Sequence, residues 1–129
     1  MGKNNLELIG MPRIIENNFK LNPIYDFSDL KNIEFELHIE SETGEINLNN
    51  HLCLYKLKVN ISDTEKNFNA YIVAEGIFKI KDNLENYKEI LKNKGSDILI
   101  SFIKPYVVSL TTAAGMQPVV LPTLDFEIK

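Results

Sequence analysis

The 129-residue sequence predicts an α+β fold, a four-stranded antiparallel sheet with a short and a long C-terminal helix packed on one of its faces. Two observations predict it. The earlier part of the chain alternates apolar and polar residues, as half-buried antiparallel strands do. The later part spaces its apolar residues as amphipathic helices do. Apolar residues make up 44% of the chain, and its length suits one domain, residues 1–129.

Four segments have the pattern of strands. The first, residues 11–21, is the least regular, whereas the second, residues 33–40, alternates strictly. The third and fourth strands are expected at residues 52–61 and 70–80. The connections between these segments suit antiparallel neighbours and are too short for helical crossovers. We therefore predict a meander, in which each strand pairs with the next one along the chain.

Two helices are expected after the last strand. Residues 84–94 carry apolar side chains at helical spacing, and Gly95 is expected to end this short helix. A longer helix is expected from residue 98 to about residue 114, with Gly115 as its stop. Pro105 lies inside the longer helix, where a proline costs about 3 kcal/mol unless the helix bends or restarts. We therefore expect a kink at Pro105 or a separate first turn.

The longer helix is apolar on almost every side. A broad apolar stripe is formed by Ile98, Leu99, Phe102, Ile103, Tyr106, Val107 and Leu110, and periodicity does not settle which face of the helix meets the sheet. Ile100 and Val108 lie off this stripe. One sheet covers an apolar face only about 100° wide, and a large exposed apolar surface promotes association. We therefore expect a homo-oligomer whose subunit interface contains Phe102, Val108, Ile100 and Tyr106.

Charge and composition exclude several classes of protein. Lys and Arg number 14 against 18 Asp and Glu, and a net charge of −4 argues against a nucleic-acid partner. No apolar run approaches the roughly 20 residues of a membrane span, and the first residues lack the apolar core of a signal peptide. The single cysteine, Cys53, cannot form an internal disulfide. We therefore expect a cytoplasmic protein that does not insert into membranes.

No motif of an enzyme is present. The sequence lacks a Walker lysine motif, GxGxxG, HExxH and Gly-x-Ser-x-Gly. His51 and Cys53, joined by His38 from the neighbouring strand, are the best candidates for metal ligands, but their spacing is that of ordinary strand residues. We therefore predict that the protein is not an enzyme and uses no cofactor and no metal.

Two segments resemble the export chaperone SecB and its wider family. Residues 71–80, YIVAEGIFKI, are similar to the family's last strand, which runs into a Gly-Ile-Phe signature. Residues 110–126 are similar to the family's helix end, which is followed by a glycine and an extended stretch with proline that closes in an Asn-Phe or Asp-Phe pair. The resemblance covers most of the chain from about Met11. It implies the same α+β fold and a dimer of dimers that sandwiches the long helices between sheets.

The resemblance also implies a function. Members of the family are ATP-independent holdase chaperones that bind unfolded polypeptides or preproteins along apolar grooves, for protein transport and translocation. The loop after the first strand and the second strand line these grooves. The matching positions here are Ile24, Tyr25, Phe27, Ile33, Phe35 and Leu37. For the three loop residues among them, packing of the loop onto the core is an equally simple interpretation.

The match to the family's docking surface for the SecA motor is partial. Glu16 corresponds to one acidic residue of that surface, but Lys20 and Tyr71 stand at two other acidic positions. The chain also ends at Lys129, where the family continues into a last helix and a motor-binding tail. The resemblance therefore gives weak support for SecA as a partner. Two alternatives to an export chaperone remain open, namely a SecB-like chaperone dedicated to one antitoxin and an interaction module for one partner.

Overall fold

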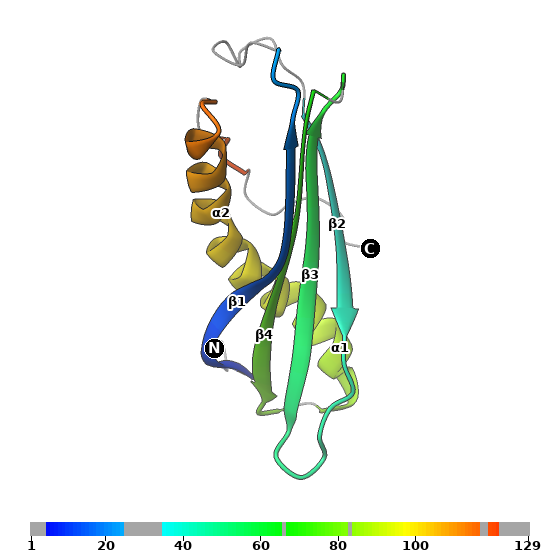
Figure 1. Ribbon diagram of the computed structural model, residues 1–129. Coiled ribbons are helices and arrows are strands. Elements are labelled where there is room, and N and C mark those ends of the chain that lie inside the picture. The colour runs from blue at the N-terminus through cyan, green and yellow to red at the C-terminus, as the bar shows by residue number, and fades with distance from the viewer. Residues whose placement is uncertain (1–4, 25–34, 66, 83, 117–118, 122–129) are drawn as a thin grey trace.

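The computed structural model describes residues 5–24, 35–65, 67–82, 84–116 and 119–121. The described chain has two layers, an antiparallel four-stranded sheet and a helical segment that covers one of its faces (Figure 1). The predicted α+β class is confirmed. Within this described part, no helix combines the length and the apolar character that crossing a membrane requires.

The strands are β1 (Leu6–Leu21), β2 (Phe35–Thr43), β3 (Leu52–Asp63) and β4 (Phe68–Ile80). All four lie where alternation predicted strands, but β1 begins earlier than expected. Its pairing with β4 shifts register twice, which interrupts the period of two that the sequence analysis relied on.

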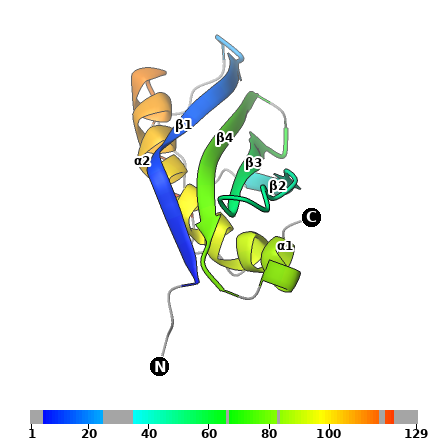
Figure 2. The ribbon, with the colours of Figure 1, turned by 90° about the horizontal axis from the view of Figure 1, so that it is seen from below.

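The order of the strands in space is β1-β4-β3-β2, so the predicted meander is correct only for β2, β3 and β4. β1 lies antiparallel to β4, and Figure 2 shows the two side by side. A fourth strand that returns beside three consecutive hairpin-connected strands is the order of a Greek key. The prediction was wrong because the long connection after β1 does not have to form a hairpin. Because β4 lies between β1 and β3 in the sheet, it is buried on both faces along much of its length.

The core lies between the sheet and the helical segment. The apolar residues of β3 share the buried face that their alternation predicted, and they are Cys53, Tyr55, Leu57, Val59 and Ile61. Residues of the long helix, α2 (Ser96–Ala113), complete the core, including Leu99, Ile103 and Val107. Full burial of one such side chain stabilises a fold by about 1.5–3 kcal/mol. The face of the sheet turned away from the helices is called the outer face below.

The helical segment is continuous from residue 84. A 3-10 turn (Leu84–Asn86) leads into α1 (Tyr87–Ile90), a π-helical turn (Leu91–Gly95) and then α2. Gly95 therefore does not end a helix, which corrects the prediction, and its backbone is helical with φ −64° and ψ −39°. Pro105 does not divide α2 either. The irregular part of the segment is the π-helical turn instead.

The end of α2 follows the prediction. Gly115 has a φ of +80°, a left-handed conformation that glycine adopts at low cost. The chain then folds back, since the main-chain N–H of Val119 donates to Oγ1 of Thr111 at 3.0 Å. Met116, Val119 and Leu121 are buried in the core. The returning segment therefore contacts the end of α2 at Thr111 and adds three apolar side chains to the core.

Candidate functional site

A cluster of aromatic rings lies on the helix-facing side of the sheet, where β1 ends and where β2 and β4 begin. The ring of Phe68 is 5.9 Å from that of Phe19 and 5.7 Å from that of Phe35, between centroids. Their tilted and edge-on orientations are typical of favourable aromatic pairs. Phe68 is buried, whereas Phe35 remains 37% exposed. The aromatic cluster therefore has one side open to solvent.

Hydrogen bonds of polar side chains fix this end of the sheet. Oδ1 of the buried Asp63 accepts the main-chain N–H of Phe68 at 2.9 Å, which closes the turn between β3 and β4. In that turn, the main-chain carbonyl of Asn67 accepts the N–H of Asn22 at 2.7 Å. The two side chains are also bonded, Asn22 Nδ2 to Asn67 Oδ1 at 3.0 Å. These bonds hold the start of the loop after β1 beside the aromatic cluster.

The structure describes three of the six residues predicted to bind unfolded chains. Phe35 and the half-buried Leu37 lie on the same face of β2, and Phe35 belongs to the aromatic cluster. Ile24 follows β1 and is almost fully exposed. Tyr25, Phe27 and Ile33 lie outside the described residues. Phe19 and Phe68 were missed by the sequence analysis, because their contact depends on the pairing of β1 with β4.

β2 is an edge strand in this sheet, with β3 as its neighbour. Its helix-facing side chains become more buried along the strand, from the exposed Phe35 through Leu37 to the buried Ile39. An edge strand presents main-chain donors and acceptors that a further extended chain can use. In the described part of the chain no strand pairs with the far edge of β2, and Phe35 and Leu37 lie along that strand.

The α2 residues predicted to form a subunit interface differ in their surroundings. Ile100 is only 2% exposed and lies in the core of its own chain. This corrects its assignment to the interface. Ile100 stands three residues before Ile103 and seven before Val107, so helical spacing puts all three on the same buried face of α2. Phe102, Tyr106 and Val108 are half-buried in the single chain, and their contact with a second subunit stays a prediction.

The carboxylate matched to the motor-docking surface, Glu16, is exposed on β1 opposite Val73 of β4. Lys20, on the same strand, is also exposed. The position of Glu16 leaves its proposed role untested.

Among the described residues, no three His, Cys, Asp or Glu side chains lie close enough together to hold a metal ion. Cys53 faces the core, while His38 pairs with Asn60 on the outer face. The thiol of Cys53 donates to the carbonyl of Gly44 at 3.2 Å. Burial raises the pKa of Cys53, and the charge of Lys88 offsets part of that rise.

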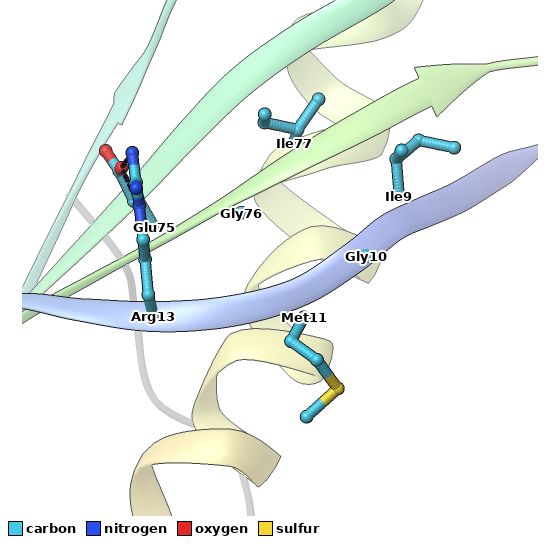
Figure 3. Close-up of a pocket in the computed structure, with 7 residues that line it drawn as sticks. All are labelled: Ile9, Gly10, Met11, Arg13, Glu75, Gly76 and Ile77. Carbon is cyan, nitrogen blue, oxygen red and sulfur yellow. Dashed lines mark hydrogen bonds and ion pairs between the residues drawn. The ribbon is translucent and has the colours of Figure 1, made fainter.

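A second surface lies on the outer face, at the irregular part of β1. Gly10 has a φ of +74°, and residues 10–12 of β1 stand opposite Gly76 of β4 between two regular pairs. At this irregularity the surface is hollowed by about 220 Å³ between β1 and β4, with Ile9, Arg13, Glu75 and Ile77 around it and the main chain of Gly10 and Gly76 along its floor. Figure 3 shows Ile9 and Ile77 standing beside this hollow, with Met11 on the other side of β1.

An ion pair borders the same hollow. Nε of Arg13 lies 2.6 Å from Oε1 of Glu75, and Nη2 lies 2.5 Å from the same oxygen. Figure 3 shows the two side chains pointing toward each other from β1 and β4. The side chain of Glu75 is 7% exposed and that of Arg13 is 73% exposed. Neither Arg13 nor Glu75 was among the predicted site residues. A carboxylate inside an apolar strand and a Gly-Met-Pro run inside another were the signals that could have found this surface.

Comparisons with known proteins match the fold but no sequence family. No family model matches the chain, and neither does any curated protein. Among solved structures, the Rv1957 SecB-like chaperone of Mycobacterium tuberculosis, in complex with a ChAD peptide from the Rv1956 HigA1 antitoxin, matches with a TM-score of 0.75. The sequences are 12% identical, and the match covers 94% of this chain and 88% of that chain. The matched protein is a SecB-like chaperone. This chain has the fold of a SecB-like chaperone.

Proposed function

We propose that this protein is an ATP-independent holdase chaperone that binds non-native polypeptide segments at the aromatic cluster and the adjoining edge of β2. The observation that carries the proposal is that the exposed Phe35 and the half-buried Leu37 lie together on β2, the edge strand of the described sheet. The likeness to a chaperone that holds a peptide supports it.

The chemistry of this surface suits unfolded chains. An extended polypeptide presents a side chain to the same face at every second residue, which matches the spacing of Phe35 and Leu37 on β2. Burial of apolar surface contributes about 25 cal/mol per Å², whatever the amino-acid sequence of the client. Main-chain hydrogen bonds to an edge strand are equally independent of sequence. Such a site therefore accepts many clients with modest affinity.

Assembly and location belong to the same proposal. Phe102, Tyr106 and Val108 contact a second subunit, and a dimer of dimers in the cytoplasm is the expected form. Export through SecA is not included, because Lys20 and Tyr71 stand where acidic residues are expected.

A dedicated chaperone for one antitoxin is the second candidate. It is favoured by the peptide bound in the matched structure, which comes from an antitoxin. The two candidates differ in the number of clients. In a competition assay, several unrelated unfolded chains should displace a labelled client if the protein is a general holdase, and only one should do so if it is dedicated.

Light scattering of a heat-unfolded client enzyme tests the proposed surface. The wild-type protein at equimolar concentration should suppress aggregation, and Phe35→Ser should lower this suppression at least fivefold because it removes the exposed ring. Leu48→Ser is the matched control, since Leu48 is an exposed apolar residue of the turn between β2 and β3. Thermal unfolding followed by circular dichroism shows whether each variant is folded. Absence of suppression by the wild type, or equal suppression by the folded Phe35→Ser variant, contradicts the proposal.

A further inference from the structure

Three apolar side chains form a row across the outer face of the sheet. Ile77 of β4 is paired with Ile9 of β1 on one side and with Leu54 of β3 on the other. Their exposed fractions are 43%, 38% and 38%. This outer row borders the hollow over Gly10 and Gly76, so one additional apolar side chain has a place to pack.

Positive charge borders the outer row along the strands. Arg13 and Lys56 occupy pair positions on either side of Glu75, and Lys79 lies two residues beyond Ile77 on β4. Neither Lys56 nor Lys79 forms an ion pair with another described residue. Both lysines can therefore bind a carboxylate supplied by a partner.

Three carboxylates near the outer row each contact a cation other than Lys56 and Lys79. Glu75 is held by Arg13, Glu7 lies 3.2 Å from Nζ of Lys81, and Glu42 lies 3.3 Å from Nζ of Lys58. The chain as a whole carries a net charge of −4. The outer row is thus a locally cationic and apolar surface on an acidic protein.

The guanidinium of Arg13 is held in an orientation in which it can bind a second carboxylate. Its Nε and one Nη contact a single oxygen of Glu75, which leaves further N–H donors of the guanidinium toward solvent, where the side chain is 73% exposed. The nearly buried Glu75 holds the guanidinium in place. A donor that is fixed beforehand loses less conformational entropy when it binds.

We infer that the outer row is a second polypeptide-binding surface, one that takes an acidic segment with apolar side chains. An apolar side chain of the partner fills the hollow over Gly10 and Gly76, and carboxylates on either side reach Arg13, Lys56 and Lys79. The surface lies on the opposite face from the aromatic cluster, so the inference does not depend on the proposed function. A hollow of this size with separate charges around it can hold one apolar side chain of a polypeptide. A membrane with anionic lipids is a poorer partner, because the net negative charge of the protein repels it.

Fluorescence anisotropy with a labelled nine-residue peptide that alternates Leu and Glu tests the inference. We expect micromolar binding that weakens as salt is added. A matched peptide with Lys in place of Glu should bind at least tenfold more weakly. The double variant Lys56→Glu with Lys79→Glu should lower the affinity for the acidic peptide at least tenfold. The control is Lys92→Glu, an exposed position in the π-helical turn, which should leave that affinity unchanged.

Other arms of the experiment separate the explanations. Ile77→Ser should also weaken binding of the acidic peptide without lowering the unfolding temperature, because Ile77 is partly exposed. The Lys56 and Lys79 double variant should still suppress aggregation of an unfolded client, which keeps this test separate from that of the aromatic cluster. Equal binding of the Lys peptide, an unchanged affinity in either variant, or binding to phosphatidylglycerol vesicles in place of the acidic peptide overturns the inference.

Discussion

Polar residues inside the core decide how the layers are joined. Oη of Tyr55 on β3 lies 2.6 Å from Oγ of Ser96 at the start of α2, which ties the helix to the sheet. Thr111 donates to the carbonyl of Val107 and accepts the N–H of Val119, which fixes the returning segment. Among the described residues, no buried side-chain N or O atom lacks a partner. Since an unsatisfied buried group costs about 1–3 kcal/mol, each bond restricts the chain to one arrangement.

Cys53 provides a prediction at this scale. The thiol is buried, and burial raises its pKa above the ordinary value of 9.0, so the folded protein favours the protonated form. Only the thiolate is a good nucleophile. We therefore expect negligible alkylation by iodoacetamide in the native protein near pH 8 and complete alkylation after unfolding in guanidinium, as mass spectrometry can show.

The same shift makes stability depend on pH. Because the pKa of Cys53 is higher in the folded state than in the unfolded chain, the thiol lowers stability only as pH rises above about 9, where the unfolded chain ionises first. Cys53→Ala should lack this contribution in urea unfolding experiments. Rapid alkylation of the native wild type would show that the thiol is not sheltered.

At the scale of elements, residue spacing predicted the strands and helices but not every junction between them. The alternation in β3 predicted its buried face correctly. β3 pairs without register shifts with β2 and β4, so every second side chain points toward the helices. The register shifts in β1 depend on pairing with a distant strand, which spacing along one segment does not contain. The prediction for Gly95 was wrong because a glycine in a helical pattern has two possible roles, to end the helix or to allow close packing. The residues around Gly95 do not distinguish the two roles.

Gly95→Ala separates these two roles. In an exposed helix the change raises stability by about 1 kcal/mol. Here a Cβ atom would lie 3.2 Å from Cδ2 of Tyr55 and 3.3 Å from Cδ2 of Leu91, both fully buried. We expect the variant to lose about 1 kcal/mol in urea unfolding, because the tight contact outweighs the helix propensity. Ser109→Ala, at an exposed position of α2, is the control and should not lose stability. A gain in stability for Gly95→Ala would show that the core yields there.

The whole molecule presents different chemistry on its two faces. The helix-facing side ends in the aromatic cluster and the adjoining Leu37. Of these, Phe35 and Leu37 could be predicted from the alternation of β2. Phe19 and Phe68 could not, because their contact requires the Greek-key order. The outer row also requires that order, since it brings Ile9 beside Ile77. Both surfaces therefore depend on the pairing of β1 with β4, which alternation along a single strand does not contain.

The oligomeric state is a property of the whole molecule, and substitutions on α2 test it because its half-buried side chains are the proposed subunit contact. Val108 is half-buried in the single chain, while the neighbouring Ser109 is exposed. If a second subunit covers Val108, then Val108→Asp buries an unpaired charge at the contact and favours smaller species. We expect the wild type to have the mass of a dimer or larger in light scattering after gel filtration, Val108→Asp to elute with lower mass, and Ser109→Asp to elute as the wild type does.

Ile103→Asp completes this comparison, since Ile103 is fully buried in the core of its own chain. That variant should unfold rather than dissociate, because the charge has no access to solvent even in a single subunit. Loss of mass with retained circular dichroism for Val108→Asp, against loss of both for Ile103→Asp, would distinguish the covered side of α2 from its sheet-facing side. A wild-type protein that stays monomeric at every concentration would refute the interface, because Phe102, Tyr106 and Val108 would then face water.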